Sequence, residues 1–180
     1  MSYLKKCFKH LHTINKHRFL VFKLSIKAGV PYRGLLHDLS KFSPSEFFES
    51  AKYYSGDRSP ITNSYDDIGY SKAWLHHQGR NKHHYEYWYD ISAPIKTPII
   101  PYKYFAEMVC DTLAAGLTYQ GKKWTKEYEL EYFNTKVDKS LINENIVKAL
   151  NQVYEEVATN GINKTIKSKN LKRIYYTYVK

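Results

Sequence analysis

The chain has 180 residues, of which 43% are hydrophobic, 16% aromatic and 25% charged. This composition predicts a globular domain with a substantial core and excludes global disorder, because so many aromatic side chains would collapse in water. No apolar stretch of about 18 residues is free of charge, which excludes a transmembrane span, and the N-terminus lacks the apolar run of a signal peptide. Cys7 and Cys110 make no disulfide framework, so we expect a cytoplasmic protein.

The formal net charge of +11 is concentrated at the two ends of the chain. Residues 1–41 carry nine Lys or Arg and one acidic residue, a balance of +8, whereas residues 42–160 carry thirteen against sixteen, a balance of −3. Residues 161–180 carry six basic residues and no acidic one. Basic ends favour an anionic partner such as phosphate, nucleic acid or a membrane surface, and the alternative is a solubilising surface.

Helices are expected almost throughout, because apolar residues recur at helical spacings and strand-like alternation is scarce. No period typical of a repeat protein is present. The expected fold class is therefore all-α, a single-domain helical bundle. Its helices are expected over residues 3–28, 32–39, 44–54, 71–78, 82–89, 101–117, 125–134, 139–160 and 171–178.

Several local signals set the expected helix ends. Ser43 and Glu46 form an expected capping box at the start of the third helix. Residues 55–69 are rich in Gly, Ser, Asp, Asn and Pro, so we expect a loop of about fifteen residues, a length more often functional or mobile than idle. Asp138 is expected to cap the most clearly amphipathic helix, which ends at Gly161.

No linker divides the chain, so a single helical domain is expected over residues 1–162. Residues 163–180 form a basic C-terminal segment with a short helix. In the first helix, Phe8 and Ile14 belong to the expected apolar stripe, and His17 faces outward from it.

The placement of the eight histidines is the strongest chemical signal. Histidine and aspartate stand together in LLHDLSKF, two histidine pairs stand in WLHHQGRNKHHYEYW, and a further aspartate stands in AEMVCDTLAA. Polar groups are costly in such apolar or aromatic runs unless they have partners. By contrast, His10 and His12 are expected on the basic surface of the first helix. The candidate metal ligands are His17, His37, Asp38, His77, His83, His84 and Asp111.

Imidazoles and carboxylates are the natural ligands of zinc, iron, manganese, nickel or cobalt. Asp38 has two oxygens and can bridge two metal ions. His77 and His84 are seven residues apart and would share one face of an unbroken helix, although Gly79 interrupts it. His76 is an alternative to His77. Histidines on separate helices converge in bundle cores, where helical metal sites are built.

These motifs resemble those of an uncharacterised family of small bacterial and phage proteins with the patterns HDLSKFSPSEF, AWLHHxxxNxHHxEYW and EMVCDxxAA. The matching segments are residues 37–47, 73–88 and 107–115. The string from His37 to Lys41 also resembles the HDxxK signature of the HD-domain metal-dependent phosphohydrolases, which are helical and use ligands in the order H…HD…D. That resemblance implies one or two divalent transition metals.

A divalent metal would create a hydroxide nucleophile from bound water, and Asp38 would orient it. Lys41 follows Asp38 by three residues and is expected to stabilise charge on a phosphoryl oxygen. Arg80 and Lys82 are expected to hold a second phosphate. Residues expected to orient the ligands are Asn81 and Glu107.

The sequence therefore favours a phosphohydrolase, either a phosphomonoesterase or a phosphodiesterase, that acts on a phosphate-containing small molecule or nucleotide. One alternative is an oxygenase with two irons in the same ligand order. A second is a basic nucleic-acid-binding module whose metal is only structural. No P-loop, GxSxG elbow or CxxC pair is present.

Overall fold

A computed structural model describes residues 1–180 as ten α-helices without any strand, which confirms the expected all-α class. Four 3₁₀ turns join them, at Leu39–Phe42, Tyr85–Trp88, Gly121–Lys123 and Lys139–Leu141. The helices are α1 (Tyr3–Ala28), α2 (Pro31–Leu36), α3 (Pro44–Tyr53), α4 (Pro60–Ile68), α5 (Lys72–Gln78), α6 (Tyr102–Gln120), α7 (Tyr128–Thr135), α8 (Glu144–Asn160), α9 (Ile162–Thr165) and α10 (Ser168–Tyr178). None of them combines the length and apolar character that a membrane span requires.

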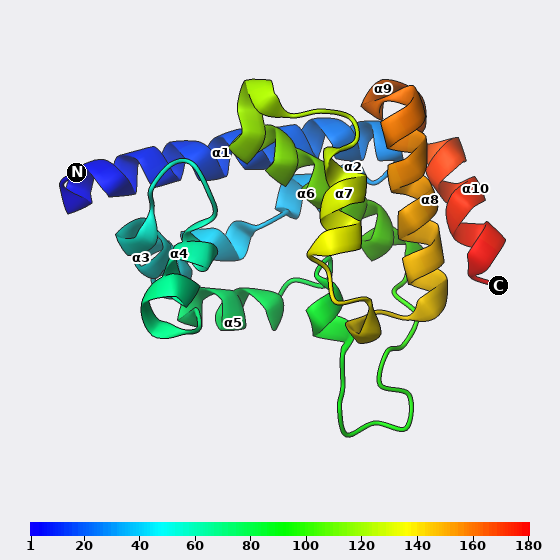
Figure 1. Ribbon diagram of the computed structural model, residues 1–180, viewed down its shortest axis with the longest axis horizontal. Coiled ribbons are helices and arrows are strands. Elements are labelled where there is room, and N and C mark those ends of the chain that lie inside the picture. The colour runs from blue at the N-terminus through cyan, green and yellow to red at the C-terminus, as the bar shows by residue number, and fades with distance from the viewer.

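The long helix α1 runs along one side of the molecule and links its two halves (Figure 1). Helices α3, α4 and α5 gather at its N-terminal end, whereas α6, α8 and α10 lie toward its C-terminal end. The apolar core sits among these last helices and contains side chains with almost no exposed surface, such as Phe105, Leu113, Ile146, Val153 and Ile174. The core therefore fixes α1 against α6, and these two helices carry two of the candidate ligands, His17 and Asp111.

The inward face of α1 differs from the one expected. Ile14 and Val21 are buried as an apolar stripe would be, but Phe8 is 67% exposed. His17 is buried on the same face as Ile14 and Val21, so the expectation that it faces outward was wrong. His10 is also buried, between the rings of Phe47 and Tyr54, and not on the basic surface. The helix thus turns two imidazoles toward the interior.

Residues 60–68 form helix α4, so the expectation of one loop over residues 55–69 was wrong. Ser59 accepts a hydrogen bond from Ile61 N, Pro60 occupies the first helical position, and Gly69 ends the helix with a φ of 80°. These are ordinary start and stop signals. The expectation of a loop followed the polar composition of the segment and not these signals. The connection between α3 and α4 is limited to residues 54–59.

Two expected caps also differ. Asp138 caps a 3₁₀ turn through Ser140 N, and Asn143 caps α8 instead by accepting a hydrogen bond from Asn145 N. Ser43 makes no side-chain cap to α3, and the Glu46 carboxylate points to histidines of α5. Because the Glu46 carboxylate does not cap the helix, it can bond to side chains in the interior.

The basic C-terminal segment packs against the rest of the chain. Leu171 and Ile174 of α10 are completely buried in the same core as α6 and α8. The Tyr175 hydroxyl donates to the carbonyl oxygen of Ile100 at 2.8 Å. Helix α10 therefore carries basic side chains on its surface and contributes its apolar side chains to the core.

Leu171→Ala should destabilise the protein by about 2–5 kcal/mol, because it leaves a cavity where the structure has no exposed surface. Urea unfolding followed by circular dichroism measures this loss. Lys169→Ala, on the exposed side of the same helix, serves as the control and should change the unfolding free energy by less than about 0.5 kcal/mol. Equal stability of Leu171→Ala and wild type would contradict the packing of α10 described above.

Candidate metal centre

The segment between α2 and the following 3₁₀ turn presents His37 and Asp38 to the interior. Helix α2 ends at Leu36, and Asp38 has a φ of 56°, so neither residue is helical as the sequence pattern suggested. Asp38 is the one residue other than glycine with a positive φ, a conformation that aspartate tolerates better than most residues. Arg18 Nε donates to the carbonyl oxygen of His37 at 2.9 Å and secures this turn against α1.

Seven side chains from five segments converge behind this turn and are all buried or half-buried. They form two groups whose potential ligand atoms lie within 4.8 Å of one another, and Asp38 belongs to both. One group is His17, His37, Asp38 and Asp111, and the other is Asp38, His77, His83 and His84. All seven ligand candidates of the sequence analysis are therefore brought together.

The two oxygens of the Asp38 carboxylate face different groups. Oδ2 lies 3.5 Å from His17 Nε2 and 3.2 Å from His37 Nε2. Oδ1 lies 3.2 Å from His77 Nε2 and 3.4 Å from His83 Nε2. This carboxylate is thus located where a bridging ligand between two cations would be.

Glu107 is a buried carboxylate behind the first group. It lies one helical turn before Asp111 on α6 and accepts a hydrogen bond from His37 Nδ1 at 3.2 Å. Its Oε1 also lies 3.2 Å from His83 Nδ1, and its Oε2 accepts from Arg33 Nε at 2.7 Å. Burial raises its pKa, but the hydrogen bonds from His37 and His83 outweigh burial and lower that pKa to about 2. Glu107 is therefore a paired anion.

Glu46 has the same position behind the second group, and the sequence analysis missed it by assigning it to a capping box. Its Oε2 lies 2.7 Å from His77 Nδ1, and its Oε1 lies 2.6 Å from His76 Nδ1. His76 belongs to neither ligand group, and Asn81 donates to the carbonyl oxygen of His77 at 2.8 Å. Carboxylates can only accept hydrogen bonds, so His37 and His77 carry a proton on Nδ1 and direct Nε2 toward Asp38.

The donor atoms fit a metal ion. His17 Nε2 and His37 Nε2 are 3.3 Å apart, and His77 Nε2 and His84 Nε2 are 3.0 Å apart. Two nitrogens bound at about 2.1 Å to one ion, at tetrahedral to octahedral angles, lie roughly 3.0–3.4 Å apart. Asp38 Oδ1 and His83 Nε2 are buried and have no hydrogen-bond partner, which is costly unless something else binds them.

The charges of the centre are strongly coupled. Burial would raise the pKa of Asp38, but His37 and Lys41 outweigh it and hold that pKa well below its usual value. Burial likewise opposes ionisation of Asp111, and His37 and His17 lower its pKa. For His84, burial together with His83 holds the pKa well below the usual value, so this imidazole is neutral and can donate a lone pair.

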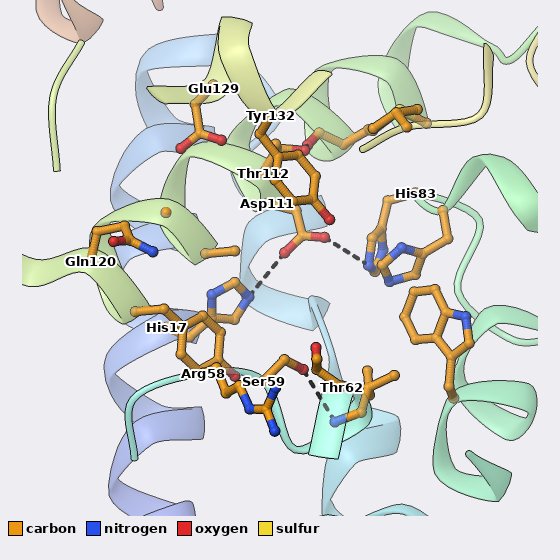
Figure 2. A pocket seen from close by; sticks show the side chains of 18 of the residues that line it. His17, Arg58, Ser59, Thr62, His83, Asp111, Thr112, Gln120, Glu129 and Tyr132 are labelled. Carbon is orange, nitrogen blue, oxygen red and sulfur yellow. Dashed lines mark hydrogen bonds and ion pairs between the residues drawn. The ribbon is translucent and has the colours of Figure 1, made fainter. Parts of the chain in front are cut away.

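A cavity of about 450 Å³ opens beside the centre. Figure 2 shows Asp111 between His17 and His83 at this opening, with Arg58 and Ser59 below them. Lys41 also lines the cavity, and its Nζ lies 2.5 Å from Asp38 Oδ2. Most of the wall is aromatic or apolar and includes Ile14, Trp74, Tyr85, Met108, Tyr119 and Tyr132.

The positive charge at the cavity does not come from Arg80 and Lys82, the residues that were expected to hold a second phosphate. Arg80 is exposed and makes a long contact of 3.5 Å with the carbonyl oxygen of His76, while the Lys82 ammonium lies over the rings of Tyr87 and Tyr104. Neither residue lines the cavity. Arg58, which lies in the segment between α3 and α4, does line it and pairs with Asp66 at 2.5 Å.

The opposite wall of the cavity carries a buried carboxyl group that the sequence analysis did not single out. Glu129 on α7 is 2% exposed, and its Oε1 accepts a hydrogen bond from Trp124 Nε1 at 3.1 Å. Burial raises its pKa to about 7, although the Trp124 hydrogen bond opposes this, and the charge of Asp111 adds to it. A Cβ at position 116 would collide with Oε1, so Gly116 leaves the space that Glu129 occupies.

Fold and site together define an all-helical single-domain protein with a buried histidine and aspartate cluster. A family model described as a family of unknown function, DUF5662, matches residues 6–156, and the chain belongs to this family. Comparisons with curated proteins and with solved structures give no match.

The raised pKa of Glu129 predicts a pH-dependent stability. The folded protein keeps a proton on Glu129 up to about pH 7, whereas an unfolded chain releases it near pH 4.5, so this contribution to stability falls as pH rises between these values. Glu129→Gln cannot ionise, and its unfolding free energy relative to wild type should improve by about 3 kcal/mol from pH 4 to pH 8. Urea unfolding at both pH values measures this.

Glu131→Gln is the matched control for this measurement, because Glu131 is an exposed carboxylate on the same helix. Its unfolding free energy should follow that of the wild type at both pH values. A parallel pH dependence of Glu129→Gln and wild type would show that Glu129 ionises normally in the folded protein.

Proposed function

We propose that this protein is a metal-dependent phosphohydrolase of the HD-domain type, with a dinuclear centre and a small phosphate ester as its substrate. The observation that carries the proposal is the Asp38 carboxylate, whose Oδ1 and Oδ2 each face a separate set of imidazoles. Helical proteins bind pairs of divalent ions with histidines and carboxylates that project from several helices, and a carboxylate shared by two ions is suited to that task.

The ligand residues divide between two ions that share Asp38. His17, His37 and Asp111 would hold one ion, and His77, His83 and His84 would hold the other. Divalent ions held there would acidify a water molecule and polarise the phosphoryl group of a substrate. Outside the ligands, Glu107 and Glu46 keep His37 and His77 in the tautomer that can bind a metal.

The walls of the cavity suit a phosphate attached to an organic group. Lys41 and Arg58 provide positive charge near Asp111, at the side where the ligands face the cavity. Aromatic rings such as Trp74 and Tyr119 offer flat apolar surface for the remainder of the substrate. A volume of about 450 Å³ is within the range of pockets for small molecules and favours a nucleotide-sized ester over a polymer.

Elemental analysis of the protein, purified without a histidine tag, tests the dinuclear centre. The wild type should contain two transition-metal ions per chain. His84→Gln removes a ligand of only one group and should leave about one ion, whereas Asp38→Asn alters the shared ligand and should leave less than one. Metal binding adds to stability, so the melting temperature should fall in the same order.

His12→Gln is the control, because His12 is an exposed histidine on α1 that belongs to neither group. It should retain both metal ions. Wild-type protein that holds no metal and gains no thermal stability from Mn²⁺, Co²⁺, Ni²⁺, Fe²⁺ or Zn²⁺ would refute the centre.

Lys41→Met should keep the metal content but lower phosphoester turnover by about a hundredfold or more. The ammonium has no lone pair for a metal ion, and it contacts the Asp38 carboxylate at the cavity wall, where it can stabilise charge that develops on a phosphoryl oxygen. The measurement is kcat on a phosphoester that the metal-loaded wild type cleaves, with the metal content of each sample determined in parallel.

Lys16→Met, on the exposed surface of α1, is the control for Lys41→Met and should retain the wild-type kcat. Wild-type turnover by Lys41→Met would assign Lys41 a structural role only. Oxygen consumption and a visible absorption band of an iron-loaded sample, without phosphoester cleavage, would favour the oxygenase over the hydrolase.

A further inference from the structure

Two carboxyl groups that line the cavity each have an oxygen without a hydrogen-bond partner. Glu129 makes one hydrogen bond, through Oε1, and its Oε2 is left for the cavity that the side chain lines. Glu86 lines the same cavity, and its Oε2 is buried without a hydrogen-bond partner. Neither carboxyl group forms an ion pair with a lysine, arginine or histidine of the chain.

These two carboxyl groups face one shared space. Tyr132 lies close enough to both for Glu129 and Glu86 to raise the pKa of its phenol, with burial as the larger cause. Tyr85 and Tyr128 line the cavity beside them. Figure 2 shows Glu129 and Tyr132 on the side of Asp111 that is away from Arg58. The part of the cavity wall around Glu129 and Tyr132 is therefore acidic and aromatic, and Arg58 lies on the other side of Asp111.

A buried oxygen such as Glu86 Oε2 is costly without a donor, so a ligand group that supplies N–H or O–H bonds would stabilise it. An amine bound beside Glu129 would likewise favour the ionised form of that carboxyl group, whose Oε2 then accepts a hydrogen bond. Two acceptors surrounded by tyrosine rings suit a nitrogen group best, because it can donate to both oxygens and, when charged, is attracted to the ring faces. Gly116 makes room for Glu129 and follows Asp111 by five residues, about 7.5 Å along the axis of α6. One small molecule can span that distance.

We propose that Glu129 and Glu86 form a subsite for an amino group of the substrate in the wall of this cavity. The proposal rests on the proposed function and names its substrate class as phosphate esters that carry an amine. The amine belongs either to a nucleobase, as in cytosine, or to an alkylammonium chain, and both sources share the same N–H donor chemistry. Glu129 is a specificity residue here, because it selects the organic part of the substrate.

The experiment compares pairs of probes that differ in the amine alone. Cytidine 5′-phosphate is paired with uridine 5′-phosphate, and phosphoethanolamine is paired with 2-hydroxyethyl phosphate, with kcat/KM measured on the metal-loaded protein. The same protein is titrated calorimetrically with the unphosphorylated probes cytidine, uridine, ethanolamine and ethylene glycol. The wild type should prefer the amino member of one pair by about tenfold or more in both measurements, and that pair identifies the source of the amine.

Glu129→Gln provides the critical variant, because it replaces the free oxygen by an NH₂ group of almost the same shape and keeps an acceptor for Trp124. Its affinity for the preferred amino probe should fall by about ten- to hundredfold, while its affinity for the partner probe should stay the same or rise. Glu131→Gln should match the wild type for every probe.

The subsite would be overturned if the wild type preferred neither amino probe, or if Glu129→Gln lost affinity equally for both members of a pair. The two proposals fail separately. Amine preference in calorimetry without cleavage of any phosphoester would support the subsite and refute the hydrolase. Cleavage of both members of each pair at equal rates would support the hydrolase and refute the subsite.

Discussion

The Asp38 carboxylate is the group on which the arrangement of the candidate centre depends. It is fully buried, and each of its oxygens lies 3.2–3.5 Å from imidazole nitrogens of a different group. Asp38 has a left-handed backbone and lies in the turn after α2. Arg18 of α1 fixes that turn by donating a hydrogen bond to the carbonyl oxygen of His37. A left-handed backbone at a residue other than glycine persists only where the surroundings enforce it, and here the Arg18 hydrogen bond and the imidazoles around the carboxylate do so.

The outer carboxylates explain how so many histidines can share one interior. An imidazole binds a metal through a nitrogen that carries no proton, and Glu107 and Glu46 hold the Nδ1 protons of His37 and His77, which leaves Nε2 as the nitrogen that a metal would bind. Arg33 neutralises Glu107, and Ser40 donates to Glu46. The polar interior is therefore organised in two layers. Asp38 Oδ1 and both ring nitrogens of His83 are buried atoms of this interior without a hydrogen-bond partner.

The sequence was informative where chemistry depends on adjacent residues and uninformative where it depends on packing. The pairing of His37 with Asp38 and the two histidine doublets indicated the cluster directly. The inward direction of His17 was missed, because a histidine on a basic helix does not look apolar, although it continues the stripe of Ile14 and Val21. Glu46 matched a capping pattern and was assigned to it, and Glu129 carries no motif at all. Only the tertiary structure shows which cavity these side chains face.

The polarity of the cavity offers the most general argument about what it binds. Lys41 and Arg58 provide positive charge in the cavity wall, and the carboxyl groups of Glu86 and Glu129 line the same cavity among aromatic rings. A molecule that carries an anionic group and an N–H donor can satisfy both kinds of side chain in one orientation, whereas the reversed orientation brings like charges together. Under the proposed function, the same charges would direct the phosphate of a substrate toward Lys41, Arg58 and the cations that the ligand groups would hold.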